Sequence, residues 1–222
     1  MQTHLDKELD ELKQKLLTMA SHTETSVKEA VAALVTRNDD LALKVKANDN
    51  VVDQFEVEID ELAVQLLAKA PLASSLRLVL MTMKISQNLE RIADEANKIA
   101  KRARDLNREA PLKVNVDFAR MAEAASAMLK GALDAFVNRD TAAARAVIGR
   151  DAEVNSFNKQ ARAELEKLMM ASPENIHRAL NLQIAVKSLE RIADHATNIA
   201  EEVVYLCEAQ DIRHADTMAR AR

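Results

Sequence analysis

Leu89-Glu-Arg-Ile-Ala-Asp-Glu-Ala-Asn-Lys-Ile99 is the stretch that decides the fold of this chain, because the chain contains it twice. The second copy, Leu189-Glu-Arg-Ile-Ala-Asp-His-Ala-Thr-Asn-Ile199, begins 100 residues after the first. The similarity extends beyond these copies, since Pro71 and Pro173 also match at a spacing of 102 residues. An internal repeat of this length predicts one structural unit that is present twice.

The composition indicates that each unit is helical. Only two glycines, three prolines and 2% aromatic residues occur in 222 residues, so the chain holds little turn or strand material. Apolar residues recur at helical spacing in both units. We expect three helices in each unit. In the first they lie at roughly 5–36, 40–69 and 73–107. In the second, the first helix runs through residues 118–136, the next extends from about residue 141 to near Pro173, and the last runs through residues 182–203.

The expected fold is therefore all-α, a tandem repeat of two antiparallel three-helix bundles. The first bundle is predicted over residues 1–110 and the second over residues 112–208, with the boundary near Pro111. The remaining residues, 209–222, have little apolar content, and we expect this tail to fray.

Charge and residue usage exclude several classes of function. A net charge of −4 without a concentrated basic face argues against a nucleic-acid partner. The single cysteine, Cys207, fits a reducing compartment, and no signal peptide or apolar run of about 18 residues is evident, so we expect a cytoplasmic protein. Gly131 and Gly149 are too few to build a phosphate-cradling glycine loop.

Each copy of the repeated stretch carries two carboxylates one helical turn apart. The first copy contains Glu90 and Asp94, and the second contains Glu190 and Asp194. On a helix, the second pair shares a polar stripe of about 80° with two further oxygen donors. These donors are Asn198 and Glu201.

The middle helix of the first unit adds further acids on one face. They are Asp49, Asp53, Glu56 and Asp60, and their counterparts in the second unit are Asp151, Asn155, Asn158 and Arg162. Carboxylates so close together repel one another, so something should compensate their charge. A hard cation such as Mg, Mn or Fe is one explanation, and arginines, lysines or solvent are the other. A di-iron oxidase is disfavoured, because Glu174 and His177 form a single Glu-x-x-His pair where such enzymes use two.

The two Leu-Glu-Arg-Ile-Ala-Asp motifs, the apolar run Leu76–Leu80 that leads into the first, and the duplicated three-helix unit resemble the PhoU family. This family comprises accessory and regulatory proteins of bacterial high-affinity phosphate transport. The resemblance implies metal clusters of iron or a divalent ion (Fe, Mn, Mg or Zn) at Glu90, Asp94, Glu190 and Asp194, and also at Asp49, Asp53 and Asp151.

The same resemblance implies a function without catalysis. Its expected partners are the ATPase subunit of the phosphate ABC transporter and the phosphate-sensing histidine kinase. It also implies a homodimer that associates peripherally with the membrane through these partners. Such a protein restrains phosphate uptake and silences the phosphate-starvation genes when phosphate is plentiful.

A second interpretation remains open. The chain could be a metal-cluster-binding helical bundle whose metal storage or metal-dependent activity is itself the function. Variants of the metal residues separate the two interpretations, because a pure adaptor tolerates them.

Overall fold

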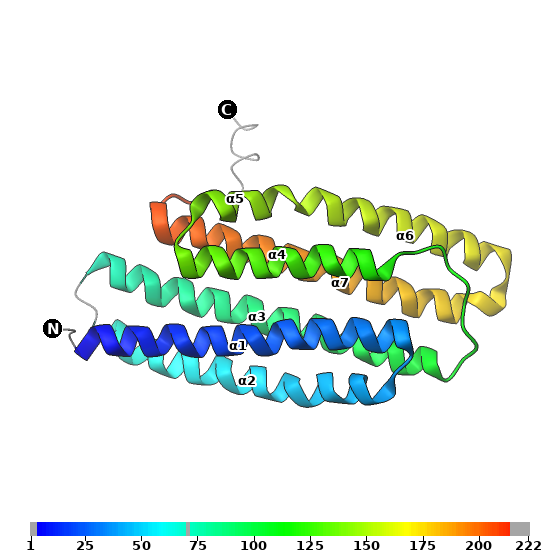
Figure 1. The fold of residues 1–222 in the computed structure, drawn as a ribbon, viewed down its shortest axis with the longest axis horizontal. Helices are drawn as coiled ribbons and strands as arrows, with labels where there is room; N and C mark the ends of the chain where they lie inside the picture. The colour runs from blue at the N-terminus through cyan, green and yellow to red at the C-terminus, as the bar shows by residue number, and fades with distance from the viewer. Residues whose placement is uncertain (1–3, 70–71, 214–222) are drawn as a thin grey trace.

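The computed structural model describes residues 4–69 and 72–213, and all regular secondary structure in these residues is helical (Figure 1). A short 3₁₀ turn, η1, precedes the last helix. The elements are α1 (His4–Thr36), α2 (Asp39–Leu67), α3 (Ala73–Asn107), α4 (Phe118–Asn138), α5 (Thr141–Gly149), α6 (Asp151–Ala171), η1 (Pro173–Asn175) and α7 (Ile176–Glu208).

The helices form two bundles that lie side by side (Figure 1). Helices α1, α2 and α3 pack on one another in the first bundle, and α7 packs on α4, α5 and α6 in the second. The bundles join through α3 and α7, the helices that carry the repeated stretch, and through α1 and α4. The predicted all-α fold of two repeated bundles is confirmed.

Helices α3 and α7 run antiparallel across this junction, as three polar contacts show. Glu202 lies 3.2 Å from Lys84 Nζ, Ser188 Oγ donates to Glu95 Oε2 at 2.7 Å, and Arg102 donates to Asn181 at 3.0 Å. Residue numbers rise along α3 while they fall along α7. The two repeated stretches therefore face each other in opposite directions.

The turns after α1 and α4 have the same local structure at equivalent positions of the repeat. Arg37 and Arg139 both adopt the left-handed conformation, with φ of 55° and 52°. The side chains that follow cap the next helices: Asn38 accepts from two backbone amides of α2, and Asp140 accepts from the amide of Ala143 in α5. Such caps satisfy amides that the first helical turn leaves free.

The structure corrects one predicted helix in the second unit. Residues 141–172 were expected to form one helix, but they form α5 and α6 with a break at Arg150. Two hydrogen bonds of the tighter 3₁₀ type, Arg150 N to Val147 O and Glu153 N to Arg150 O, replace the α-helical pattern there. Gly131 of α4 lets α5 approach closely, because a Cβ at this glycine would lie 2.9 Å from Val147 Cγ2.

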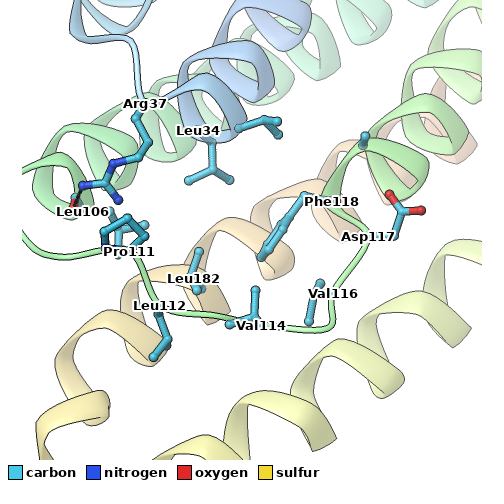
Figure 2. Close-up of a pocket in the computed structure, with 12 residues that line it drawn as sticks. Leu34, Arg37, Leu106, Pro111, Leu112, Val114, Val116, Asp117, Phe118 and Leu182 are labelled. Atoms are coloured by element: carbon cyan, nitrogen blue, oxygen red, sulfur yellow. Dashed lines mark hydrogen bonds between the residues drawn. The ribbon is translucent and has the colours of Figure 1, made fainter.

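The segment 108–117 links the two bundles and covers a cavity of about 330 Å³ (Figure 2). Arg37 holds the segment in place, since its Nη2 donates to the carbonyl oxygens of Leu106 and Glu109 at 2.7 and 2.6 Å. Apolar side chains form most of the wall: Leu34, Leu106, Pro111, Leu112, Val114, Val116, Phe118 and Leu182.

Beyond α7 the chain stays against the bundle for a few residues. Ile212 packs against the core, and Arg213 Nη1 lies 3.3 Å from Glu202 Oε1. The fraying expected from residue 209 stays a prediction, because residues 214–222 lie outside the described residues. Along the described chain, no helix combines the length and the apolar character that crossing a membrane requires.

Candidate functional site

The repeated stretch separates an apolar face from an acidic edge. Leu89 and Ile92 of α3 are fully buried, and so are Leu189 and Ile192 of α7. Burying each such side chain stabilises the fold by about 1.5–3 kcal/mol. This orientation fixes the acid pair of each copy at the border of the core, next to the middle helix of its own bundle.

The first acidic cluster comprises Asp49, Asp53 and Glu56 of α2 and Glu90 and Asp94 of α3. The structure brings all five into electrostatic contact. Burial, and secondly the charge of a nearby carboxylate, raises the pKa of Asp49, of Glu56 and of Glu90. Both burial and the neighbouring carboxylates disfavour the charged form of these three groups.

Neighbouring hydrogen-bond donors and one arginine offset part of the negative charge of the first cluster. Asn97 Nδ2 donates to Asp49 Oδ2 at 2.5 Å, and Arg91 Nε and Nη1 lie 3.3 and 3.7 Å from Glu90 Oε2 and Asp94 Oδ2. Even so, the buried Oε2 of Glu90 accepts no hydrogen bond from the described part of the chain. The ion pair with Arg91 is therefore what offsets the charge of this buried oxygen within the described residues.

The second acidic cluster comprises Asp151, the first residue of α6, and Glu190 and Asp194 of α7. Burial first, and then the charges of Glu190 and Asp151, raises the pKa of Asp194 to about 6. Burial followed by the charge of Glu190 also raises the pKa of Asp151. The three carboxylates, which come from two helices, are therefore close enough to repel one another.

Lys187 and Arg191 offset part of the charge of this cluster, and one of its buried oxygens accepts no hydrogen bond within the described residues. Lys187 forms an ion pair with Glu190, which is 9% exposed. Asp151 Oδ2 accepts from Asn155 Nδ2 at 2.6 Å, whereas its buried Oδ1 has no hydrogen-bond partner among residues 4–69 and 72–213. Each cluster thus contains a buried carboxylate oxygen that accepts no hydrogen bond within the described residues.

The structure places the other two predicted donors of α7 away from this cluster. Asn198 Nδ2 donates to Asn88 Oδ1 of α3 at 3.3 Å, so this side chain lies at the junction between bundles. Each step of four residues turns about 40° around a helix, which carries the line from Glu190 to Asn198 toward α3. Glu201 lies about two turns beyond Asp194 on α7, where its charge acts on Arg213. Hydrogen bonding to Asp211 is the first cause that raises the pKa of Arg213, and the charges of Glu202 and Glu201 raise it further.

The PhoU domain family matches the chain twice, over residues 16–103 and 118–203. The chain belongs to the PhoU family. A phosphate-specific transport system accessory protein PhoU homolog from Pseudomonas aeruginosa is 41% identical over 209 residues, which cover 93% of this chain and 86% of that protein. A homolog of the same name from Aquifex aeolicus is 36% identical over 213 residues, covering 95% and 96% of the two chains.

Two solved structures have the same fold as these PhoU domains. The crystal structure of PhoU from Pseudomonas aeruginosa superposes with a TM-score of 0.90 at 39% identity, covering 93% of this chain and 100% of the other. The phosphate transport system regulatory protein PhoU from Streptococcus pneumoniae gives a TM-score of 0.81 at 25% identity, covering 94% and 99%. Each acidic cluster lies within one of the two matched PhoU domains.

The donor chemistry of both clusters suits a hard cation. Both consist of carboxylates, which Mg, Mn and Fe favour, and both hold a buried oxygen that accepts no hydrogen bond within the described residues. In the described ranges, however, no group of three or more His, Cys, Asp or Glu side chains is arranged so that it could hold a metal ion. A metal would therefore have to draw these carboxylates closer together.

Glu56 belongs to the first cluster, as its place on the acidic face of the middle helix beside Asp49 and Asp53 indicated. Glu95, only 4% exposed, instead bonds across the bundles to Ser188 and to Arg191. No sequence pattern within either unit indicated that contact, because it depends on how the two bundles meet.

Proposed function

We propose that this chain is a non-enzymatic negative regulator of phosphate homeostasis. In this proposal it restrains high-affinity phosphate uptake and keeps the phosphate-starvation genes silent when phosphate is plentiful. The observation that carries the proposal is the double match to the PhoU domain, together with relatives named as accessory proteins of the phosphate-specific transport system. Two long bundles built from surface-exposed helices also suit a protein that binds partners.

The proposed mechanism is that of an adaptor. The chain would contact the ATPase subunit of the phosphate ABC transporter and the phosphate-sensing histidine kinase, at the cytoplasmic side of the membrane and as a homodimer. These partners follow from the resemblance to PhoU regulators. The absence of a membrane-crossing helix among the described residues is compatible with peripheral association through them.

Separately from the adaptor role, we propose that the two acidic clusters bind metal. Asp49, Asp53, Glu90 and Asp94 would hold an iron or divalent ion in the first cluster; Asp151, Glu190 and Asp194 would hold one in the second. The buried oxygens of Glu90 and Asp151 that accept no hydrogen bond within the described residues support this assignment. A bound cation would neutralise the clustered acids. The same cation would also be able to coordinate an acidic group on a partner.

The alternative function is metal storage or a metal-dependent activity of the clusters themselves. The crowding of carboxylates around Asp49, Glu90 and Asp194 favours it, because a cation would offset their mutual repulsion. The two functions make opposite predictions for a variant that has lost its metal but is still folded.

The test is an alkaline phosphatase reporter in the source bacterium at high phosphate. Deleting the gene for this chain should lock the reporter on, and the intact chain should silence it again. A reporter that stays silent after deletion would contradict the regulatory function.

Complementation with the double variant E190A/D194A then separates the two functions. An adaptor that does not need its metal restores silencing, whereas a protein whose clusters carry the function fails to do so. The exposed Asp134 of α4 supplies the matched control, since Asp134→Ala removes a carboxylate outside both clusters.

A further inference from the structure

A basic cavity of about 400 Å³ lies between α2 and α3. Seven residues line it: Ala42, Lys46, Asn97, Lys101, Arg104, Asp105 and Arg108. Four of these side chains are cationic. Asn97 also donates to Asp49, so it stands between this cavity and the first acidic cluster.

The four cations are not compensated by the chain itself. Across the described residues, the side chains of Lys46, Lys101, Arg104 and Arg108 make no ion pair or hydrogen bond. Asp105 is the one acid in the lining, and it pairs instead with Arg102, at 3.3 Å from Nη1 to Oδ2. The cavity therefore concentrates positive charge that no ion pair among the described residues neutralises.

One donor of this group is also buried. Arg104 Nε is hidden from solvent and has no hydrogen-bond partner in the described part of the chain. Buried polar groups are nearly always satisfied by protein, water or a ligand, and a guanidinium is more costly to leave unpaired than a neutral group. This N–H points to an acceptor that the chain does not supply.

Stability of the fold does not account for these cations. The negative end of a helix stabilises positive charge only within its last turn, which covers Arg104 but not Lys46 or Lys101. The second unit reaches the same fold with different residues at the repeat-equivalent positions. These residues are Ile148, Glu201, Val204 and Glu208.

We propose that the basic cavity binds a phosphate group, either as free inorganic phosphate or as a phosphate monoester. Two guanidinium groups match the oxygen geometry of phosphate, and two ammonium groups add charge. Four cations around one cavity suit a dianion better than a single carboxylate. This site differs from the acidic clusters and does not depend on the metal or on the proposed regulatory role.

The test is isothermal titration of the full-length chain with inorganic phosphate. The buffer contains EDTA, so that phosphate held through a metal does not contribute. Lys46→Glu reverses one charge in the lining and should weaken phosphate binding at least about tenfold. Lys44→Glu is the matched control, because Lys44 is an exposed lysine on the same helix that does not line the cavity, and it should leave the affinity within about twofold.

A second variant tests the buried donor with the charge retained. Arg104→Lys removes Nε and should weaken binding several-fold, while circular dichroism shows an unchanged helical fold. Raising the salt concentration should weaken binding in the wild type, as expected for charged groups that reach solvent.

Flotation with phosphatidylcholine vesicles, with and without phosphatidic acid, distinguishes the source of the phosphate group. If the chain binds free phosphate, and if K46E weakens this binding while K44E does not, the ligand is a soluble phosphate. Binding to the phosphatidic acid vesicles alone, with the same difference between variants, supports a lipid headgroup. Absence of both, or equal loss in K46E and K44E, would overturn the proposal.

Discussion

The two acidic clusters are built on the same motif but differ in the helix that faces it. In the first, α2 contributes Asp49, Asp53 and Glu56 to the acid pair of α3. In the second, α6 contributes Asp151 alone, because Asn155, Asn158 and Arg162 occupy the other repeat-equivalent positions. The motif thus sets where a carboxylate pair lies, and the facing helix sets how much negative charge surrounds it.

The two copies of the motif also differ in the contacts that they make with each other across the junction between bundles. Position seven of the stretch is Glu95 in α3 and His195 in α7. Glu95 accepts hydrogen bonds from Ser188, Arg191 and Lys98, whereas His195 Nδ1 lies 2.9 Å from Asn88 Oδ1. Equivalent positions therefore form a charged contact at one side of the junction and a largely neutral one at the other.

The largest expected effect comes from the apolar half of the motif. Ile92→Ala and Ile192→Ala should each lower the free energy of unfolding by about 2–5 kcal/mol, because both side chains are fully buried and leave a cavity. Urea unfolding monitored by circular dichroism measures the loss. A cost confined to one copy would show that the two bundles do not use the motif in the same way.

A smaller effect is expected at the junction between bundles. Glu95→Gln should lower the free energy of unfolding by about 1–2 kcal/mol at pH 7, because it replaces charge-assisted hydrogen bonds by neutral ones. His195→Ala, at the equivalent position, should cost about 0.5–1.5 kcal/mol. Urea unfolding of the two variants beside the wild type gives both values.

The pH dependence of stability further separates Glu95→Gln from His195→Ala. Burial alone would raise the pKa of Glu95, but hydrogen bonds from Lys98, Ser188 and Arg191 lower it below the ordinary value. Its stabilisation is therefore present above about pH 4.5 and is lost as the pH falls through the lowered value. Glu95→Gln should match the wild type in strong acid, and a cost that persists there would contradict the assigned contacts.

The smallest expected effect is at Asp194, whose pKa is raised to about 6, first by burial and then by Glu190 and Asp151. Between about pH 4 and 6 the folded chain holds a proton here that the unfolded chain releases, so stability falls as the pH rises. Asp194→Asn avoids this cost and should raise the melting temperature by about 2–4 °C at pH 8, which corresponds to roughly 1 kcal/mol after allowance for solvent screening.

Thermal melts in EDTA at pH 4 and pH 8 test this expectation, with Asp134→Asn as the control on an exposed site. The gain should vanish near pH 4. An equal gain at both pH values, or the same gain in the control, would show that crowding of carboxylates is not the cause.

Repetition and spacing predicted most of the architecture, because they report on each unit separately. The helices near residues 5–36, 40–69 and 73–107 match α1, α2 and α3. The break at Arg150 was not predictable from periodicity. It depends on two local hydrogen bonds that leave the apolar spacing of the segment unchanged.

The candidate site was predictable in part for the same reason. Helical spacing grouped Glu190 with Asp194, which lie close together, whereas Asn198, at the edge of the predicted stripe, contacts Asn88 of α3. Pairing of α3 with α7, and the basic cavity between α2 and α3, depend on contacts between distant segments. Such contacts leave no periodic signal within one helix.

Metal content measured by mass spectrometry tests the central claim most directly. The chain is loaded anaerobically with Fe²⁺, desalted and compared with E190A/D194A and E90A/D94A. The account predicts that E190A/D194A loses the metal of the second cluster, since only Asp151 remains there. E90A/D94A should keep weakened binding through Asp49, Asp53 and Glu56. Metal content equal to that of the wild type in both variants would contradict the assignment of the repeated acid pairs as ligands.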